Sequence, residues 1–73
     1  MVKELDIKTP AQVQKINKLA SEQPYEVFLT NGTVMLDARS LLGLFTLIGQ
    51  RVSVVAEDDV DPNRFGKLVQ HMA

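Results

Sequence analysis

The sequence predicts an α+β domain with the element order βαββαβα, in which a four-stranded antiparallel sheet carries three helices on one face. Three observations lead to this prediction. Two helix starts each have a proline directly after a capping residue, an Asn-Gly pair joins two strand-like segments, and the strand-like segments each have one apolar face. The length fits one small domain, residues 1–73, because domains rarely fall below about 50 residues.

The first strand is predicted over residues 3–7, where apolar and polar side chains alternate. The helix after it begins with Thr9 as the N-cap, Pro10 at the first helical position and Gln12 placed as in a capping box. It ends before Pro24, because the residue before a proline is disfavoured in the α region. The expected core side chains of these two elements are Leu5, Ile7, Val13, Ile16, Leu19 and Ala20.

The clearest local signal is Asn31-Gly32 between residues 25–30 and 33–37, since this pair is preferred in a tight type I′ hairpin turn. A two-residue turn pairs Thr30 with Thr33, Leu29 with Val34, Phe28 with Met35, and Val27 with Leu36. That register puts one apolar set on the buried face: Val27, Leu29, Val34 and Leu36. The other face carries Phe28, Met35 and Val55, which form either a homodimer surface or a cross-strand pair that stiffens the hairpin.

The second half of the chain predicts a short helix, a strand and a longer helix. Ser40 is the expected N-cap of a short helix over residues 41–47. Residues 51–57 are rich in valine and are predicted to form the last strand. Asp61 and Pro62 start the last helix, and Val60 is placed to staple against Phe65. The apolar stripe of that helix consists of Phe65, Leu68, Val69 and Met72.

Composition excludes several classes of function. Eight basic and nine acidic residues, with no basic patch, argue against a nucleic-acid partner. The longest apolar stretch, residues 41–48, is too short to span a bilayer, so no membrane partner is expected. The absence of cysteine excludes disulfides and fits a reducing cytoplasm. The single histidine, His71, has no Asp, Glu or Cys at ligand spacing, and therefore no metal site or cofactor is predicted.

Residues 40–49, Ser-Leu-Leu-Gly-Leu-Phe-Thr-Leu-Ile-Gly, resemble the HPr family, the histidine phosphocarriers of the bacterial sugar phosphotransferase system. In that family a regulatory serine caps a short helix, followed by two large apolar residues and a glycine. The Asn-Gly hairpin and the acidic lead into the C-terminal helix are similar as well. The resemblance covers nearly the whole chain and implies the HPr-like fold, an open-faced β-sandwich of four strands and three helices.

The carrier site of that family is missing from this sequence. The family has a histidine just before the first helix, followed two residues later by an arginine and then a proline, whereas this chain has Ile7-Lys8-Thr9-Pro10-Ala11. Imidazole, with a pKa near ~6.5, suits phosphate carriage at neutral pH. Lys8 is protonated there, and Thr9, the matching position, would form a stable ester and has no neighbouring base to activate its hydroxyl. Thr9 is expected to be a helix cap only, and the chain is not expected to be an enzyme.

Ser40 is the strongest single candidate for a functional residue. In the HPr family the matching serine is phosphorylated by a dedicated kinase, and a helix N-terminus favours a bound phosphate. The alternative is an ordinary N-cap that stabilises its helix by about 1 kcal/mol. Arg39 either pairs with an added phosphate or keeps the end of the preceding strand soluble.

Leu41, Leu42 and Phe45 form the second candidate, a partner interface. If Leu44 and Leu47 of the short helix face the core, these three side chains point at least partly outward. The matching positions in HPr proteins dock on partner proteins. The alternative is a deeply seated helix whose apolar residues all fill a small core.

The sequence therefore predicts a bacterial, cytoplasmic HPr-like module that is regulatory or mediates protein interaction and is not catalytic. Its expected partners are proteins of the phosphotransferase system or of the transcription-regulator type, and phosphorylation of Ser40 is the candidate switch. Two alternatives stay open. One is a phosphocarrier that uses an unconventional residue, and the other is a structural homo-oligomer subunit that uses the open face of the sheet.

Overall fold

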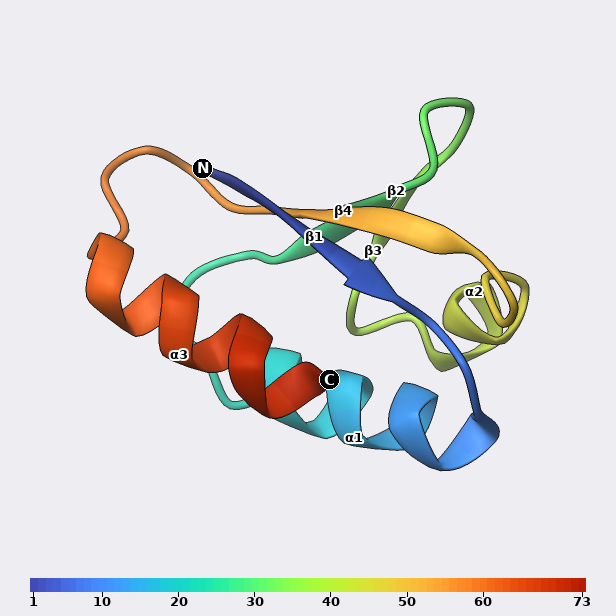
Figure 1. Cartoon of the computed structure of the whole chain (residues 1–73). Helices are drawn as coiled ribbons and strands as arrows, with labels where there is room; N and C mark the ends of the chain where they lie inside the picture. The colour runs from blue at the N-terminus through green and yellow to red at the C-terminus, as the bar shows by residue number, and fades with distance from the viewer.

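The computed structural model describes residues 1–73 and has the predicted order βαββαβα. Its elements are β1 (Val2–Asp6), α1 (Pro10–Ser21), β2 (Phe28–Thr30), β3 (Met35–Asp37), α2 (Leu41–Phe45), β4 (Arg51–Val55) and α3 (Pro62–Met72). All strand pairs are antiparallel, and the sheet order is β1-β4-β2-β3. In Figure 1, α1 and α3 lie beneath the sheet, α2 lies at one end of it, and the upper face carries no helix.

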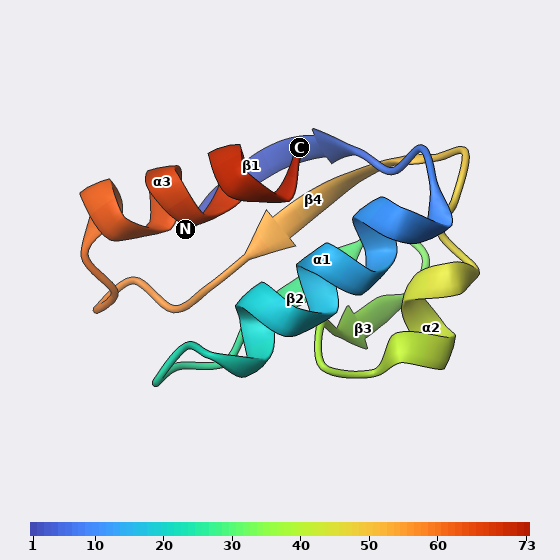
Figure 2. The same ribbon diagram turned by 90° about the horizontal axis from the view of Figure 1, so that it is seen from below.

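The core lies between the sheet and the helices. Every buried side chain is apolar, and the predicted inward positions of β1, α1 and α3 are among them, apart from the half-buried Leu19. α1 packs against both α2 and α3, as the view from below shows (Figure 2). None of the three helices has the length and apolarity needed to cross a membrane.

Both predicted helix starts are confirmed. The Thr9 hydroxyl accepts a hydrogen bond from the backbone N–H of Gln12 at 3.1 Å, and the Asp61 carboxylate accepts one from the N–H of Asn63 at 3.0 Å. These bonds satisfy N–H groups that a helix leaves unpaired at its first turn. The capping box differs in one detail, because the Gln12 side chain accepts from the N–H of Lys8 at 2.8 Å and not from that of Thr9.

The predicted hairpin register is wrong by two residues. Phe28 pairs with Asp37, Leu29 with Leu36 and Thr30 with Met35, so residues 31–34 form a four-residue connection. A type I′ turn needs a positive φ at both central residues, but only Gly32, at 93°, has one. The side chain of Asn31 instead accepts hydrogen bonds from the N–H groups of Thr33 and Val34, each at 3.0 Å. Val34 is consequently exposed in the connection and is not part of the core.

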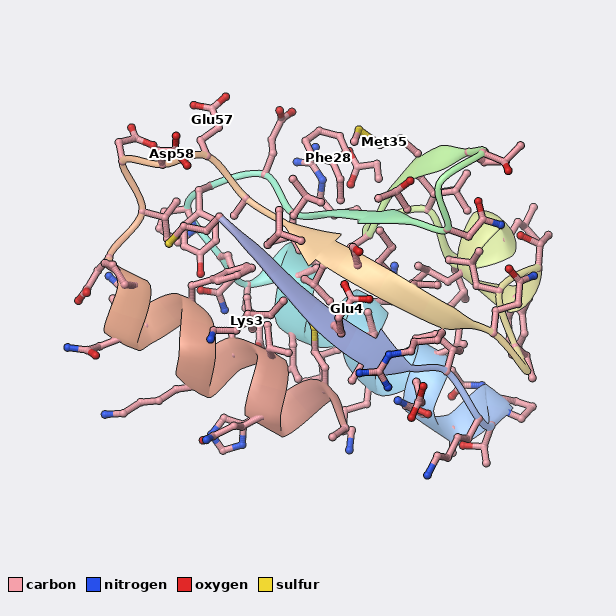
Figure 3. All side chains as sticks on the ribbon, turned by 45° about the horizontal axis from the view of Figure 1, so that its top comes forward. Lys3, Glu4, Phe28, Met35, Glu57 and Asp58 are labelled. Atoms are coloured by element: carbon pink, nitrogen blue, oxygen red, sulfur yellow. The ribbon has the colours of Figure 1, made fainter.

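The shift also corrects the predicted pair on the outer face of the sheet. Phe28 lies across from Asp37 and Val55, whereas Met35 lies across from Thr30. Because the error is two residues, the faces are preserved, and Phe28 and Met35 both project from the face without helices (Figure 3). The last three strands are shorter than predicted, at residues 28–30, 35–37 and 51–55, whereas the first strand keeps its length but covers residues 2–6 instead of 3–7. The short helix ends at Phe45.

Candidate functional site

The outer surface of α2 carries three large apolar side chains that are at least partly exposed. Leu44, 1% exposed, and the buried Leu47 anchor the segment inward. Leu41, Leu42 and Phe45 are 38%, 83% and 37% exposed. Their predicted outward orientation is confirmed, and these three residues are called the α2 apolar surface below.

Close packing of α2 on β3 fixes that orientation. A Cβ atom added at Gly43 would lie 3.3 Å from the Ser40 Oγ and 3.4 Å from a methyl carbon of Leu36. An added Cβ would therefore crowd only the Ser40 hydroxyl and would touch Leu36 of β3 at an ordinary contact distance, so α2 packs directly against the Leu36 side chain at Gly43. A helix of five residues is marginal in water on its own, so packing by Leu44 and Gly43 is what holds it.

Ser40 occupies the N-cap position of α2, but its side chain does not cap the helix. Its backbone is extended, its N–H donates to the carbonyl of Asp37 at 2.9 Å, and its carbonyl accepts from the N–H of Leu44 at 3.1 Å. The hydroxyl makes no capping hydrogen bond, and the residue is exposed. The expectation of an ordinary side-chain cap is therefore wrong, and the hydroxyl is open to solvent.

Arg39 is engaged with carboxylates on the open face of the sheet. Its guanidinium donates to both carboxylate oxygens of Asp37, at 2.7 and 3.1 Å, and to Glu26 at 3.3 Å. These hydrogen bonds lower the pKa of Asp37, and the same contacts raise the pKa of Arg39. A phosphate on Ser40 would have to compete with two carboxylates for this cation.

The start of α1, where the resemblance led us to expect the carrier site, borders a shallow hollow of about 360 Å³. The end of α3 borders it, because Gln12 Nε2 donates to the carbonyl of Met72 at 3.1 Å and Lys15 Nζ donates to that of Ala73 at 2.7 Å. Its lining side chains include Lys8, Thr9 and Lys15 but no imidazole. His71 is exposed in the last turn of α3 and does not line the hollow.

These features define an α+β open-faced sandwich with an exposed apolar surface on its short helix. More specifically, the fold is HPr-like. The crystal structure of HPr-C-His from Thermoanaerobacter tengcongensis matches with a TM-score of 0.68 and 22% sequence identity, covering 99% of this chain and 88% of that chain. No protein-family model matches this sequence, and no curated protein does. The likeness confirms the fold expected from residues 40–49.

Two features of the surface were not predicted from the sequence. One is the ion-pair cluster that joins Asp37 and Arg39, at the end of β3, to Glu26 of an earlier segment. The other is a groove between β1 and α3, lined by residues that include Lys3 and Gly66. The sequence alternation of β1 could have indicated the groove, because it places the charged Lys3 on the same side of the strand as the core residue Leu5.

Proposed function

We propose that the domain is a non-catalytic module that binds a protein partner through the α2 apolar surface, in the cytoplasm and in connection with the phosphotransferase system. The observation that carries the proposal is the exposure of Leu41, Leu42 and Phe45 on a helix whose opposite side is buried. Full burial of a side chain of this size is worth about 1.5–3 kcal/mol, so a partner gains most of that energy by covering Leu42 and only the exposed share of it, roughly a third, by covering Leu41 or Phe45. The expected partner is a protein of the phosphotransferase system or a transcription regulator.

The composition of the α1 hollow supports recognition over phosphate carriage. Thr9 is already committed as an acceptor for the Gln12 N–H, and its neighbours Lys8 and Lys15 are cations at neutral pH. A labile phosphoryl group needs a nucleophile that is largely unprotonated at that pH. The side chains that line this hollow supply none.

Cross-linking from a single position tests the docking surface. A photoreactive amino acid replaces Leu42 in the source cell, and a matched variant carries it at Gln14, which is exposed on α1. We expect a cross-linked product from position 42 that is absent from position 14 and disappears when Leu41→Glu is added. Identical products from the two positions, or a product that survives Leu41→Glu, would overturn the proposal.

We further propose that phosphorylation of Ser40 switches this docking off. A phosphate adds a charge of about −1.5 to −2 beside Leu41, and burying it in an apolar interface is unfavourable. Support comes from the exposed hydroxyl, which makes no capping hydrogen bond, and from the engagement of Arg39 by Asp37 and Glu26.

Incubation with HPr kinase and ATP, followed by mass spectrometry, tests the switch. We expect one phosphate on Ser40 and none on the Ser40→Ala variant. The phosphorylated protein should also lose the cross-link from position 42. An unmodified Ser40, or a cross-link that is insensitive to the phosphate, would remove the switch and leave the docking proposal standing.

A homodimer through the open face of the sheet is a second candidate function. The observation in its favour is that Met35 is 58% exposed on a face that no helix covers, with Phe28, Val55 and Val2 nearby. Static light scattering of the parent against Phe28→Glu and Met35→Glu tests it. A dimer that both substitutions convert to monomer would support it, whereas a dimer that persists, or a parent that is monomeric, would exclude it.

A further inference from the structure

The outer edge of β1 has unpaired backbone groups. The sheet order leaves β1 at an edge. At its two ends, the N–H of Ala56 donates to the carbonyl of Met1 at 3.0 Å, and the N–H of Ile7 donates to the carbonyl of Gln50 at 2.9 Å. In an antiparallel pair every second residue bonds to the neighbour, so the odd-numbered residues face β4 and the even-numbered ones face outward.

Val2 and Glu4 therefore each present an N–H and a carbonyl at the free edge. The next outward residue is Asp6, whose carbonyl is already occupied, because it accepts from Gln12 Nε2 at 2.8 Å. The usable length of the edge thus ends where α1 begins. A strand that paired here would bond to Val2 and Glu4 and would end before α1.

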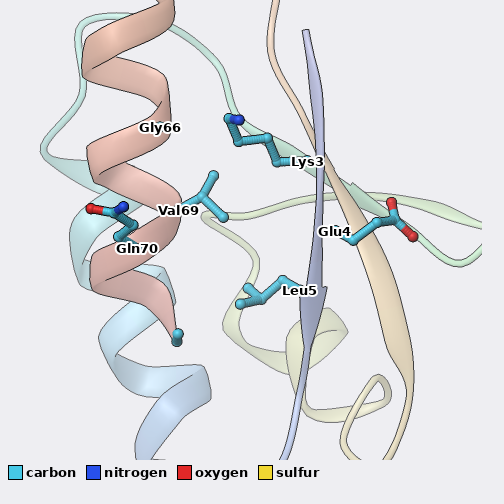
Figure 4. A pocket seen from close by; sticks show the side chains of 7 residues that line it. Lys3, Glu4, Leu5, Gly66, Val69 and Gln70 are labelled. Carbon is cyan, nitrogen blue, oxygen red and sulfur yellow. The ribbon is translucent and has the colours of Figure 1, made fainter.

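A groove runs beside this edge, between β1 and α3. It has a volume of about 460 Å³, and its apolar floor is made by Leu5 and Val69. A second hollow of about 420 Å³ shares Lys3 and Gly66 with it and continues along α3. Figure 4 shows Lys3 pointing from β1 towards α3, while Glu4 points to the opposite side of the strand. The groove lies where the inward side chains of an added strand would be seated.

Gly66 keeps the groove open without a structural requirement for glycine. Its φ is not positive, and an added Cβ would meet only the Lys3 Cε at 3.6 Å, an ordinary contact. A glycine inside a helix costs about 0.5–1 kcal/mol relative to alanine. Neither backbone strain nor packing requires glycine at this position.

We propose that the β1–α3 groove binds an extended peptide segment as a fifth strand on β1, with an acidic side chain of the segment facing Lys3. Main-chain hydrogen bonds to Val2 and Glu4 would supply affinity, and alternate side chains would lie over Leu5 and Val69. Lys3 is the charged side chain that points from β1 towards α3 in this groove, since Glu4 points away, and Lys67 lines the adjoining hollow. The groove therefore favours a carboxylate on a side chain of the added strand that points towards α3.

The same charges disfavour a second copy of β1 as the occupant. Two antiparallel β1 strands related by a two-fold axis at Glu4 would put Glu4 opposite Glu4, and an axis at Lys3 would put Lys3 opposite Lys3. An axis at Leu5 would put Glu4 opposite Asp6. Like charges directly opposite one another destabilise a strand pair. An inward-pointing lysine such as Lys3 also protects an edge strand against unspecific pairing. A strand that places a carboxylate opposite this lysine neutralises its charge and can therefore pair where other strands cannot.

Fluorescence anisotropy with two labelled probe peptides tests the proposal. One is Thr-Val-Thr-Glu-Thr-Val-Thr, and the other has lysine in place of glutamate. We expect the glutamate peptide to bind the parent about fivefold more tightly than the lysine peptide, and Lys3→Glu to reverse this order. Lys18→Glu, which makes the same charge change on the exposed side of α1, should leave the order unchanged. Gly66→Leu, checked for folding by circular dichroism, should weaken both peptides.

Amide hydrogen exchange identifies the mode of binding. We expect the glutamate peptide to protect the N–H groups of Val2 and Glu4, while those of Lys3 and Leu5, which already face β4, change little. Protection without this alternation would overturn strand addition. The proposal also fails if neither peptide binds at millimolar concentration, if the parent prefers the lysine peptide, or if the parent dimerises and the dimer occupies this edge. None of these outcomes bears on docking at α2.

Discussion

Two leucines two residues apart on α2 should differ sharply in what they contribute to stability. Leu42 is 83% exposed and Leu44 is 1% exposed. Full burial of a leucine side chain is worth about 1.5–3 kcal/mol, so the buried sixth of Leu42 contributes at most ~0.5 kcal/mol. Leu44→Ala loses the whole transfer energy and leaves a cavity, which costs about 2–5 kcal/mol. A chain of this length is expected to have only about 4–11 kcal/mol in total.

Urea unfolding followed by circular dichroism measures the difference. With a slope of about 1 kcal/mol per molar urea for a small domain, Leu44→Ala should lower the midpoint by about 2 M or more and Leu42→Ala by less than about 0.5 M. The two variants remove the same atoms from the same helix, so each is the control for the other. If Leu42→Ala lost as much stability as Leu44→Ala, Leu42 would belong to the core, and the α2 apolar surface would not exist as described.

Three further substitutions test other parts of the structure. Asn31→Ala removes two side-chain hydrogen bonds in the hairpin connection and should lower the free energy of unfolding by about 1 kcal/mol, and an unchanged urea midpoint would contradict the four-residue turn. Gly66→Ala should raise the free energy of unfolding by about 0.5–1 kcal/mol, whereas a loss would show that α3 needs glycine there. Because hydrogen bonds from Arg39 lower the pKa of Asp37 in the folded state, the stability advantage of the parent over Asp37→Asn should be complete well above the ordinary value of 3.8 and should be lost as the pH falls through the lowered folded-state pKa. Melting temperatures at neutral pH and near pH 2 measure this advantage, and a difference that is equal at both would refute the ion pair.

The features predicted correctly from the sequence are those that depend on neighbouring residues. Thr9-Pro10 and Asp61-Pro62 set the helix starts because a cap and the proline after it act within one turn. The core faces also follow from local spacing, since a helix or strand buries the side that its apolar residues share. The outward orientation of Leu42 follows once Leu44 is assigned to the core.

The features that were missed depend on a choice between local alternatives or on distant segments. Asn31 can adopt a positive φ in a type I′ turn or bond its side chain to the next backbone amides, and residue type does not decide between these. Ser40 is correctly placed at the N-cap, but its side-chain rotamer leaves the hydroxyl unbonded to the helix. The pairing of Arg39 with Glu26 joins segments that only the fold brings together.

Phosphate transfer is the most direct test of the proposal that the domain recognises partners and does not act as a phosphocarrier. The chain is incubated with Enzyme I of the phosphotransferase system and radiolabelled phosphoenolpyruvate, beside an HPr protein that has its carrier histidine as the positive control. Because no imidazole lines the hollow at the start of α1, we expect label on the control and none on this chain. Label that appears on this chain and passes to an acceptor would contradict the proposal.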